Sequence, residues 1–241
     1  MKIVVFAPHQ DDESFACAGT IAKHVKISGD DVVLVMMTDG RLGFNPRIEG
    51  KYTEDQLASI REKELLNAAK AMGLREEQVV QFRYHDQDLG NPSHHDEVIE
   101  KIMDVLDNAD IVYLAITNFR HQDHHNMYFL VFETLEKIKF DKEIRVGTPV
   151  PIIALRGGKP KQHKNKFDHI DTVFPVVEQK LKIDISGVYQ EKINAILSHE
   201  SQLNMFYNLV DPKDDFKEGL TTIFTELYGN KVELFEVRKI V

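Results

Sequence analysis

The chain has 241 residues, of which 42% are hydrophobic and 29% charged, so it can bury a full core as one large globular domain without disulfides. Its formal charge of −9, from 30 basic and 39 acidic residues, repels polyanions and excludes nucleic acid as an expected partner. A single cysteine, no apolar stretch of membrane-spanning length and a start unlike a signal peptide lead us to expect a cytoplasmic protein.

The first half of the chain alternates short apolar runs with longer segments of helical periodicity. The predicted strands are residues 3–6, 32–37, 79–82 and 111–114. The predicted helices are residues 14–28, 53–73, 93–107 and 124–137. Thr53 to Gln56 form a capping box, Ser93 is the expected cap of its helix, and Gly29 and Gly73 supply stops.

The second half is less regular. It contains a predicted strand at residues 148–155 and a Gly- and Lys-rich loop at 156–166. Ser186 is the expected cap of a helix that reaches Ser198, and a final strand at 232–237 follows the turn at Gly229-Asn230. This order predicts an α/β, Rossmann-like layered fold with a mostly parallel central sheet and helices on both faces. We expect one domain over residues 1–241, with the core at about 1–155 and a less regular part at about 156–241.

The loop after the first predicted strand carries Pro8-His9-Gln10-Asp11-Asp12-Glu13. In parallel sheets, functional sites lie outside the carboxyl ends of the strands. Three carboxylates beside an imidazole repel one another unless a cation is present, and a divalent metal would resolve that conflict. A helix N-terminus that favours acids would explain Asp12 and Glu13, but it leaves His9 without a role.

The loop after the fourth predicted strand carries Arg120-His121-Gln122-Asp123-His124-His125, with three of the 11 histidines of the chain. Taken alone, it could be a solvated polar loop. Because both loops follow parallel strands, their side chains can converge at one edge of the sheet.

Two imidazoles and one carboxylate, from His9, His124 and Asp12, form a donor set that suits Zn²⁺ better than Mg²⁺. Zinc would activate a water molecule. Asp11 is the nearest carboxylate left to accept the proton, and a protonated His121 could stabilise an oxyanion and protonate the leaving amine.

These segments resemble the motifs of the LmbE-like, PIG-L-type family of zinc-dependent sugar de-N-acetylases. The first segment resembles the family's (A/P)-H-P-D-D-E motif, and His121 to His124 match its H-x-D-H motif. Further similar segments, which extend the resemblance over residues 2 to 205, are Thr38-Asp39-Gly40, Arg61-Glu62-Lys63-Glu64, Tyr84 to Leu89 around Asp86, Asp184-Ile185-Ser186, Lys192 and His199-Glu200-Ser201-Gln202.

The resemblance implies a role for each matching residue. His9, Asp12 and His124 would be the metal ligands, and Asp11 the general base. The remaining implied roles are His121 as electrostatic or acid catalyst, Asp123 as the residue that orients its ring, and Arg61 and Asp86 as contacts to the sugar.

The chain departs from the family pattern at three positions. Gln10 and Gln122 stand where proline is common, and neither glutamine is an expected ligand. Phe119 occupies a position where some members carry a tyrosine that assists the reaction, so that auxiliary hydroxyl is absent here.

Other polar residues allow two interpretations each. Glu13 is expected to bond the backbone or a ligand, Asp39 to neighbour the metal or form a turn, and His199 to approach the site or to cap and pack. The basic stretch at residues 159–166 is either a surface loop or a lid that meets an anionic part of the substrate.

The expected function is removal of an N-acyl group, which we expect to be acetyl, from an amino sugar or sugar conjugate, with Zn²⁺ as cofactor. The alternatives are a metal-dependent phosphoesterase or esterase, and a sugar-binding module without turnover. A nucleotide-binding fold is disfavoured because no G-x-G-x-x-G follows the first strand. The expected partner is a small N-acetylated amino sugar, with no nucleic acid or membrane, and the chain is expected to form a homo-oligomer.

Overall fold

The structure is a computed structural model that describes residues 1–43, 50–116, 121–147, 177–203, 215–227, 229, 231–238 and 240. Among its described helices, none combines the length and the hydrophobicity that a membrane crossing requires.

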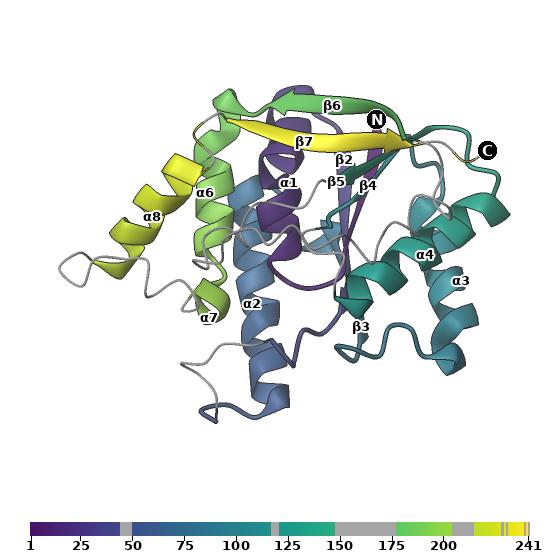
Figure 1. Cartoon of the computed structure of the whole chain (residues 1–241), viewed down its shortest axis with the longest axis horizontal. Coiled ribbons are helices and arrows are strands. Elements are labelled where there is room, and N and C mark those ends of the chain that lie inside the picture. The colour runs from purple at the N-terminus through teal and green to yellow at the C-terminus, as the bar shows by residue number, and fades with distance from the viewer. Residues whose placement is uncertain are drawn as a thin grey trace, which may run out of the picture.

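Within the described residues, one seven-stranded sheet has the order β3-β2-β1-β4-β5-β7-β6 (Figure 1). The strands are β1 (Lys2–Ala7), β2 (Asp31–Thr38), β3 (Val79–Tyr84), β4 (Ile111–Leu114), β5 (Glu143–Gly147), β6 (Val177–Asp184) and β7 (Val232–Arg238). The first five along the sheet are parallel, and β7 is antiparallel to both of its neighbours. The prediction of a mostly parallel α/β sheet is confirmed.

The main helices are α1 (Asp12–Lys23), α2 (Glu54–Met72), α3 (His95–Leu106), α4 (Gln122–Lys137), α6 (Tyr189–Leu197), α7 (Glu200–Leu203) and α8 (Phe216–Leu227). The α1 helix continues into a π-helical turn, His24–Ser28, and Gly29 ends it with φ 68°. The capping box predicted at Thr53 is present, and Gly73 ends α2 with φ 93°. Both glycines adopt the left-handed conformation that a side chain would disfavour.

Two predicted caps are wrong. Ser93 lies inside a short 3₁₀ turn, Pro92–His94, and its amide donates to the Asn91 side chain, which is the cap. Ser186 lies inside another such turn, Ser186–Val188, that precedes α6. In both places a polar residue next to a helix start is part of a preceding turn, which sequence spacing alone does not distinguish from a cap.

Alternate residues of β1 face two separate cores. Ile3 and Val5 pack with α1 and α2 on one face of the sheet. Val4 and Phe6 pack with α3 and α4 on the other. Because both faces are covered, the central strands read as continuous apolar runs, and full burial of each such side chain stabilises the fold by roughly 1.5–3 kcal/mol.

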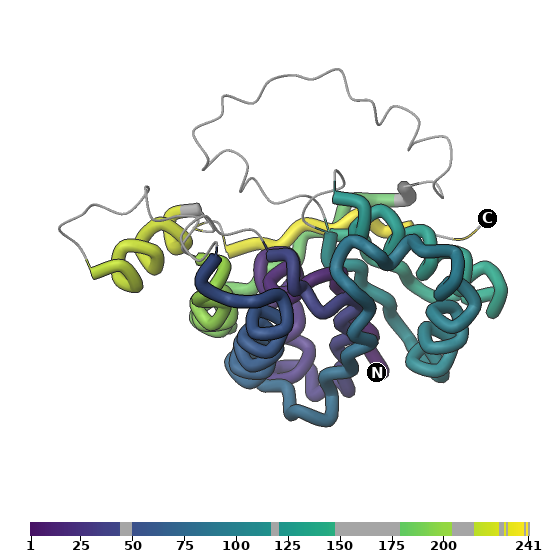
Figure 2. The backbone as a smooth tube through the Cα atoms, turned by 90° about the horizontal axis from the view of Figure 1, so that it is seen from below, coloured from purple at the N-terminus to yellow at the C-terminus, as the bar shows by residue number. Residues whose placement is uncertain are grey.

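The C-terminal part packs against the first half of the chain. Helix α6 lies beside α1 and α2 (Figure 2), and Phe15 joins Ile193, Ile196 and Phe224 in a third apolar cluster. The final strand was predicted, whereas β5, β6 and α8 were missed. The predicted strand at residues 148–155 and loop at 156–166 lie outside the described residues. Strands β6 and β7 complete the sheet, and the assignment of one domain over residues 1–241 stays a prediction.

The topology places the two motif loops side by side. Strand β1 pairs with β2 on one side and β4 on the other, so the connections after β1 and β4 diverge to opposite faces. This is the switch point at which open α/β sheets bind ligands.

Candidate metal centre and active site

The turn between β1 and α1 brings His9 and Asp12 together. The Asp12 amide donates to the His9 carbonyl at 3.2 Å, and the His9 amide donates to Asp12 Oδ2 at 3.2 Å. Asp12 Oδ2 also lies 3.2 Å from His9 Nδ1. These short-range contacts fix both side chains at the carboxyl end of β1, and both are buried.

The start of α4 supplies the second half of the cluster. His121 is the N-cap of this helix, and its Nδ1 accepts a hydrogen bond from the Asp123 amide at 3.3 Å. One turn later, His124 Nε2 lies 3.2 Å from Asp12 Oδ2. One oxygen of Asp12 therefore joins the two predicted imidazole ligands.

Two separations within the expected ligand set, both to Asp12, are compatible with a tetrahedral metal ion. Ligand atoms bound to zinc at about 2.0–2.2 Å are about 3.3–3.5 Å apart in a tetrahedron, and Asp12 Oδ2 lies 3.2 Å from a nitrogen of each imidazole. One ligand atom from each of His9, His121 and His124 lies within 4.8 Å of the others, and a second such group joins His9 and His121 to Asp86 and Asp123. Both groups contain His121 and neither contains Asp12, so the cluster could hold a metal with His121 as a competing ligand.

The charges of the cluster call for a cation. His9 Nε2 lies 3.1 Å from Asp123 Oδ2 and 3.3 Å from Asp86 Oδ1. Burial disfavours the imidazolium, but hydrogen bonds and charges from Asp12, Asp123 and Asp86 outweigh it and raise the pKa of His9 well above its usual value. Burial lowers the pKa of His124 to about 4, so His124 is neutral and available as a ligand.

Asp11 points away from this contact set. It has φ 120° and ψ −32°, and its carboxylate does not cap α1. Its side chain is 18% exposed, and one oxygen lies 3.7 Å from the Arg61 guanidinium. Burial raises the pKa of Asp11 to about 7, with further contributions from Asp12 and Glu13 that Arg61 opposes. A carboxyl group with a pKa near neutrality is suited to proton transfer.

The two residues predicted to contact sugar are buried, with Arg61 3% and Asp86 4% exposed. The Arg61 guanidinium donates to the Gly40 carbonyl at 2.9 Å and to the Gln10 carbonyl. Asp86 Oδ2 accepts from the Leu42 amide at 3.1 Å, while Oδ1 faces His9. Both side chains hold site loops together, and contact with substrate stays a prediction for each.

Asp123 also differs from its expected position. Its carboxylate bonds His9 Nε2 at 3.1 Å and the Gln87 amide at 2.7 Å, and it is the backbone amide of Asp123 that bonds His121. The carboxylate is therefore placed to orient the His9 ring, and the expected orientation of His121 comes from the helix start itself.

The glutamines at the proline positions bridge neighbouring loops. The Gln10 side chain donates to the Thr38 carbonyl at 3.0 Å, and that of Gln122 donates to the Gln87 carbonyl at 2.7 Å. Proline could make neither bond, so each glutamine replaces ring stiffness with a side-chain tether. Phe119 lies outside the described residues, as does the predicted lid at 159–166.

The structure also locates three residues for which the sequence allowed two roles each. Glu13 bonds the Asp11 amide, as expected of a backbone contact. His199 lies against Glu13 inside the protein, next to the turn that carries Asp11. Asp39 pairs with Arg41 and accepts from the Asp86 amide at 3.2 Å, which makes it a loop residue.

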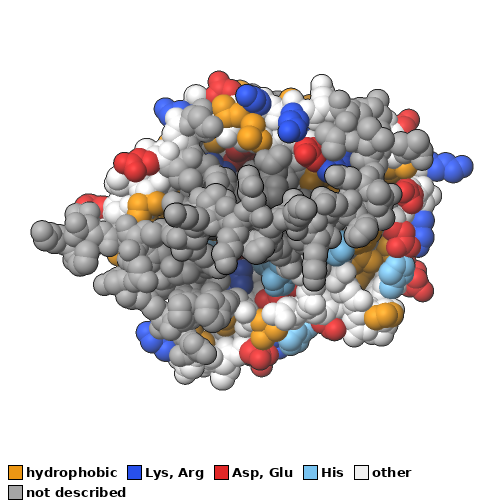
Figure 3. Space-filling view, viewed as in Figure 1, with side chains coloured by type: hydrophobic (Ala, Val, Ile, Leu, Met, Phe, Trp, Pro, Cys, Tyr) orange, Lys and Arg blue, Asp and Glu red, His pale blue; other side chains and the backbone are white. Residues whose placement is uncertain are grey.

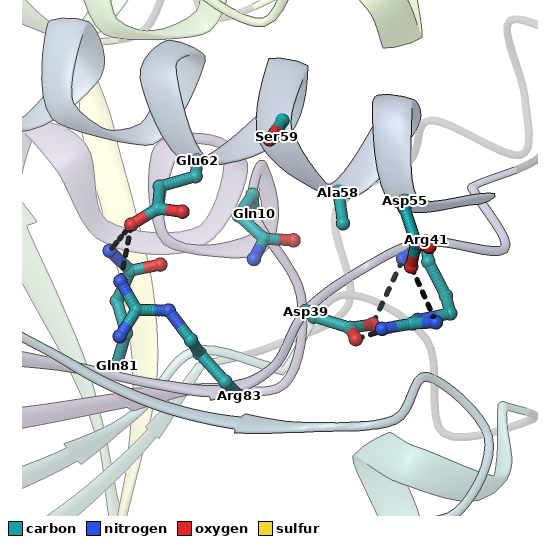
Figure 4. Close-up of a pocket in the computed structure, with 9 residues that line it drawn as sticks. All are labelled: Gln10, Asp39, Arg41, Asp55, Ala58, Ser59, Glu62, Gln81 and Arg83. Atoms are coloured by element: carbon teal, nitrogen blue, oxygen red, sulfur yellow. Dashed lines mark hydrogen bonds and ion pairs between the residues drawn. The ribbon is translucent and has the colours of Figure 1, made fainter. Parts of the chain in front are cut away.

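A cavity of about 330 Å³ lies beside the cluster, between α2 and the ends of β2 and β3 (Figure 4). Its lining includes Gln10, but none of His9, Asp12, His121 and His124. Its charged side chains pair with one another, as in Arg41 with Asp39 and Asp55, and Glu62 with Arg83. The charged side chains that line the cavity are therefore paired with one another, and the cavity is a polar depression.

On the face of the molecule shown in Figure 3, histidine side chains are visible beside acidic ones.

The sequence matches the PIG-L family, described as GlcNAc-PI de-N-acetylase, over residues 4–135. This span exceeds half of the 241 residues and contains every side chain of the cluster described above.

Sequence similarity to individual relatives extends over most of the chain. A probable N-acetyl-alpha-D-glucosaminyl L-malate deacetylase 2 of Bacillus anthracis is 24% identical over 223 residues, which are 91% of this chain and 88% of the relative.

Among solved structures, the N,N'-diacetylchitobiose deacetylase of Pyrococcus horikoshii matches with a TM-score of 0.66 and 21% identity, covering 98% of this chain and 83% of that one. The 4-carboxy-2-hydroxymuconate hydratase GalB of Pseudomonas putida KT2440 matches with a TM-score of 0.64 and 17% identity, covering 100% and 96%. At these identities the likeness shows the fold, and since the fold serves both a deacetylase and a hydratase, it does not decide the chemistry.

Proposed function

The chain belongs to the PIG-L family of GlcNAc-PI de-N-acetylases, and we propose that it removes an N-acetyl group from an amino sugar or sugar conjugate with the help of one zinc ion. The resemblance that the motifs carry is confirmed by this membership, and with it the prediction of a hydrolase of the de-N-acetylase class.

One observation carries the proposal for this particular chain. A single oxygen of Asp12 lies 3.2 Å from a nitrogen of both His9 and His124, while the neighbouring Asp11 carboxylate is directed elsewhere. A module that only binds sugar or metal could use the contacts of Asp12 with the two imidazoles, but it has no use for a separate carboxylate beside them. A carboxyl group that lies beside a metal site without being a ligand is suited to accept the proton of an attacking water.

We assign His9, Asp12 and His124 as the zinc ligands. Two nitrogens and one oxygen leave a fourth tetrahedral position open, as in catalytic zinc sites. Zinc bound there would polarise the substrate carbonyl and acidify a water ligand. His121 is the competing ligand by distance, but its Nδ1 is engaged by the Asp123 amide, so we leave it outside the ligand set.

The remaining residues handle the proton and the developing negative charge. Asp11 accepts the proton of the attacking water and, once protonated, delivers it to the nitrogen of the leaving amine. In the neutral ring of His121, Nδ1 accepts from the Asp123 amide, which leaves the proton on Nε2 as a hydrogen-bond donor. Burial and the charge of His9 lower the pKa of His121, which favours this neutral form. His121 therefore stabilises the oxyanion as a neutral donor, whereas the motif alone suggested an imidazolium.

Asp123 and Asp86 orient the His9 ring by facing its Nε2, which leaves Nδ1 toward Asp12. A carboxylate partner of this kind fixes the tautomer of a ligating histidine.

A reducing compartment such as the cytoplasm suits the buried free thiol of Cys17. Formation of a homo-oligomer stays a prediction, which light scattering can check.

The test is a substrate panel. Zinc-loaded protein would be incubated with N-acetylglucosamine, diacetylchitobiose, N-acetylglucosaminyl malate, an O-acetyl sugar and a sugar phosphate, and free amine, acetate and phosphate would be measured. We expect amine and acetate in equal amounts from at least one N-acetyl sugar. Release of acetate from the ester alone, or of phosphate alone, would contradict the proposal, and saturable binding without turnover would indicate a binding module.

A further inference from the structure

The turn that carries Asp11 has an unfavourable backbone conformation. Asp11 has φ 120°, a region that L-residues rarely adopt and that glycine alone tolerates well. The chain must pass from the end of β1 at Ala7 to the start of α1 at Asp12 in four residues. This conformation directs the Asp11 carboxylate toward Arg61 while the Asp12 carboxylate faces the imidazoles.

A buried glutamate holds that turn. Glu13 Oε2 accepts the Asp11 amide at 3.0 Å. The other oxygen, Oε1, accepts from Ser14 Oγ at 2.7 Å and lies 2.8 Å from His199 Nε2. Glu13 and His199 are both 0% exposed, so neither can exchange this contact for one with water.

His199 comes from the far end of the chain. It lies between α6 and α7, and its carbonyl accepts from the Gln202 and Leu203 amides at the start of α7. A separate contact fastens α7 to α2, in which the Ser201 amide and hydroxyl donate to the two oxygens of Glu64 at 2.6 and 2.7 Å. The docking of α7 and the contact to Glu13 therefore depend on different side chains.

We propose that Glu13 and His199 are positioning residues for the general base, which hold the Asp11 turn in the conformation that separates Asp11 from the ligand Asp12. This inference rests on the proposed function for the role of Asp11, but the contact itself can be tested without activity. The described hydrogen bonds of the His199 ring go to Glu13 and Ser14 and to none of the three proposed metal ligands. Its structural effect therefore reaches the reaction through Glu13 and the Asp11 amide, while its charge also acts on Asp11 directly and lowers the pKa of that carboxyl group.

The experiment compares three variants of the zinc-loaded full chain. His199→Ala removes the donor to Glu13. His199→Gln places an amide donor near the position of Nε2 and loses nothing at Nδ1, which has no hydrogen-bond partner among the described residues. Ser201→Ala is the matched control, because it removes the hydroxyl half of the contact of α7 to Glu64, keeps the backbone half and leaves Glu13 untouched.

Two readouts are measured for each variant. The first is hydrogen exchange at the Asp11 amide, followed by NMR against amides of β2 as an internal reference. The second is kcat and KM on the best substrate of the panel. For His199→Ala we expect faster exchange at Asp11, a kcat lower by about 10- to 100-fold from the misplaced base, KM within about twofold and unchanged zinc content. His199→Gln should recover most of both effects, and Ser201→Ala should show neither.

The proposal is overturned if His199→Ala leaves exchange at Asp11 unchanged, or if Ser201→Ala lowers kcat as much as His199→Ala does. If His199→Ala does not fold, Ser14→Ala carries the test, since it removes the second donor to Glu13 Oε1 and should raise exchange at Asp11 to a smaller extent. Unchanged exchange there also overturns the proposal. If no substrate is turned over at all, the proposed function fails, while the exchange data still decide whether His199 holds the turn.

Discussion

The edge of the parallel sheet and the C-terminal segment contribute to the same site in different ways. The loops after β1 and β4 supply the chemistry, because His9 and Asp12 of the first loop meet His121 and His124 of the second. The segment from β6 to β7 supplies none of these groups. It contributes His199 against Glu13, and Lys192 against Glu233, which in turn accepts from the Gly19 and Thr20 amides of α1.

The difference shows how reactive groups and their support are divided. Ligands that share an ion have to lie within a few ångströms of one another, so two short motifs at one sheet edge are sufficient. The helix that begins inside the first motif is held by buried charged residues from more than 170 residues away in the sequence. We therefore expect substitutions at the sheet edge to alter zinc content and kcat. Substitutions in the C-terminal segment should alter the free energy of unfolding and the positioning of the site residues.

The largest expected effect is loss of the metal. Asp12→Asn removes the anionic oxygen that faces both imidazoles, and we expect zinc affinity to fall by more than about 100-fold. Elemental analysis after dialysis measures this. The matched control is His125→Ala, one residue beyond His124, which should retain one zinc per chain. Full zinc content in Asp12→Asn, or its loss in the control, would break the assignment of the ligands.

The next effect separates the two neighbouring aspartates. Asp11→Asn keeps nearly the same volume but cannot accept a proton, so kcat should fall by roughly 10²- to 10⁴-fold. Zinc content should stay close to that of wild type, because Asp11 does not belong to the contact set of Asp12. Steady-state kinetics with metal analysis on the same sample is the check. If Asp11→Asn loses zinc, the two roles are reversed.

A third prediction concerns stability in the C-terminal segment. Lys192 is 0% exposed, and its ammonium group bonds Glu233 at 2.5 Å and the Phe15 carbonyl at 2.9 Å. Lys192→Met leaves a buried carboxylate without its cation and should lower the free energy of unfolding by about 3–5 kcal/mol. The exposed pair Lys217–Glu200 is the control, and Lys217→Ala should cost no more than about 1 kcal/mol. Urea denaturation compares the two, and equal effects would contradict the supporting role of Lys192.

The smallest expected effect is the release of a proton from His9 when zinc binds. Because carboxylates raise the pKa of His9 well above its usual value, we expect His9 to be protonated at pH 7 in the metal-free protein. Zinc requires the neutral ring, so binding should release about one proton from His9, and affinity should fall as the pH falls. Calorimetry at pH 7 in buffers of different ionisation enthalpy gives the count. Asp11→Asn removes a possible second contribution, and no proton release in that variant would contradict the environment assigned to His9.

The parallel core of the sheet and the expected metal ligands could be predicted from the sequence, for a physical reason. The strands of the parallel core are buried on both faces, so they read as apolar runs, and the ligands follow them directly. The edge strand β6 carries alternating charges, and in β5 the charged Glu143 and Arg145 interrupt the apolar residues, so neither shows that signal.

The buried partners of the site could not be predicted in the same way. The contact of His199 with Glu13 joins residues 186 positions apart, and no spacing encodes it. Likewise, the burial of Arg61 and Asp86 and the pairing of Asp123 with His9 depend on how loops from separate strands meet. The resemblance to a family indicated which residues matter there, but not what each one touches.

The central claim is that one zinc ion between the two motif loops makes this chain an amide hydrolase. Its most direct test is a titration of metal-free protein with zinc, in which acetate release from the best N-acetyl sugar is followed at each addition. We predict no release without metal, then a rise proportional to zinc that ends at one equivalent per chain. Release that is independent of zinc, or that begins only above one equivalent, would contradict the account.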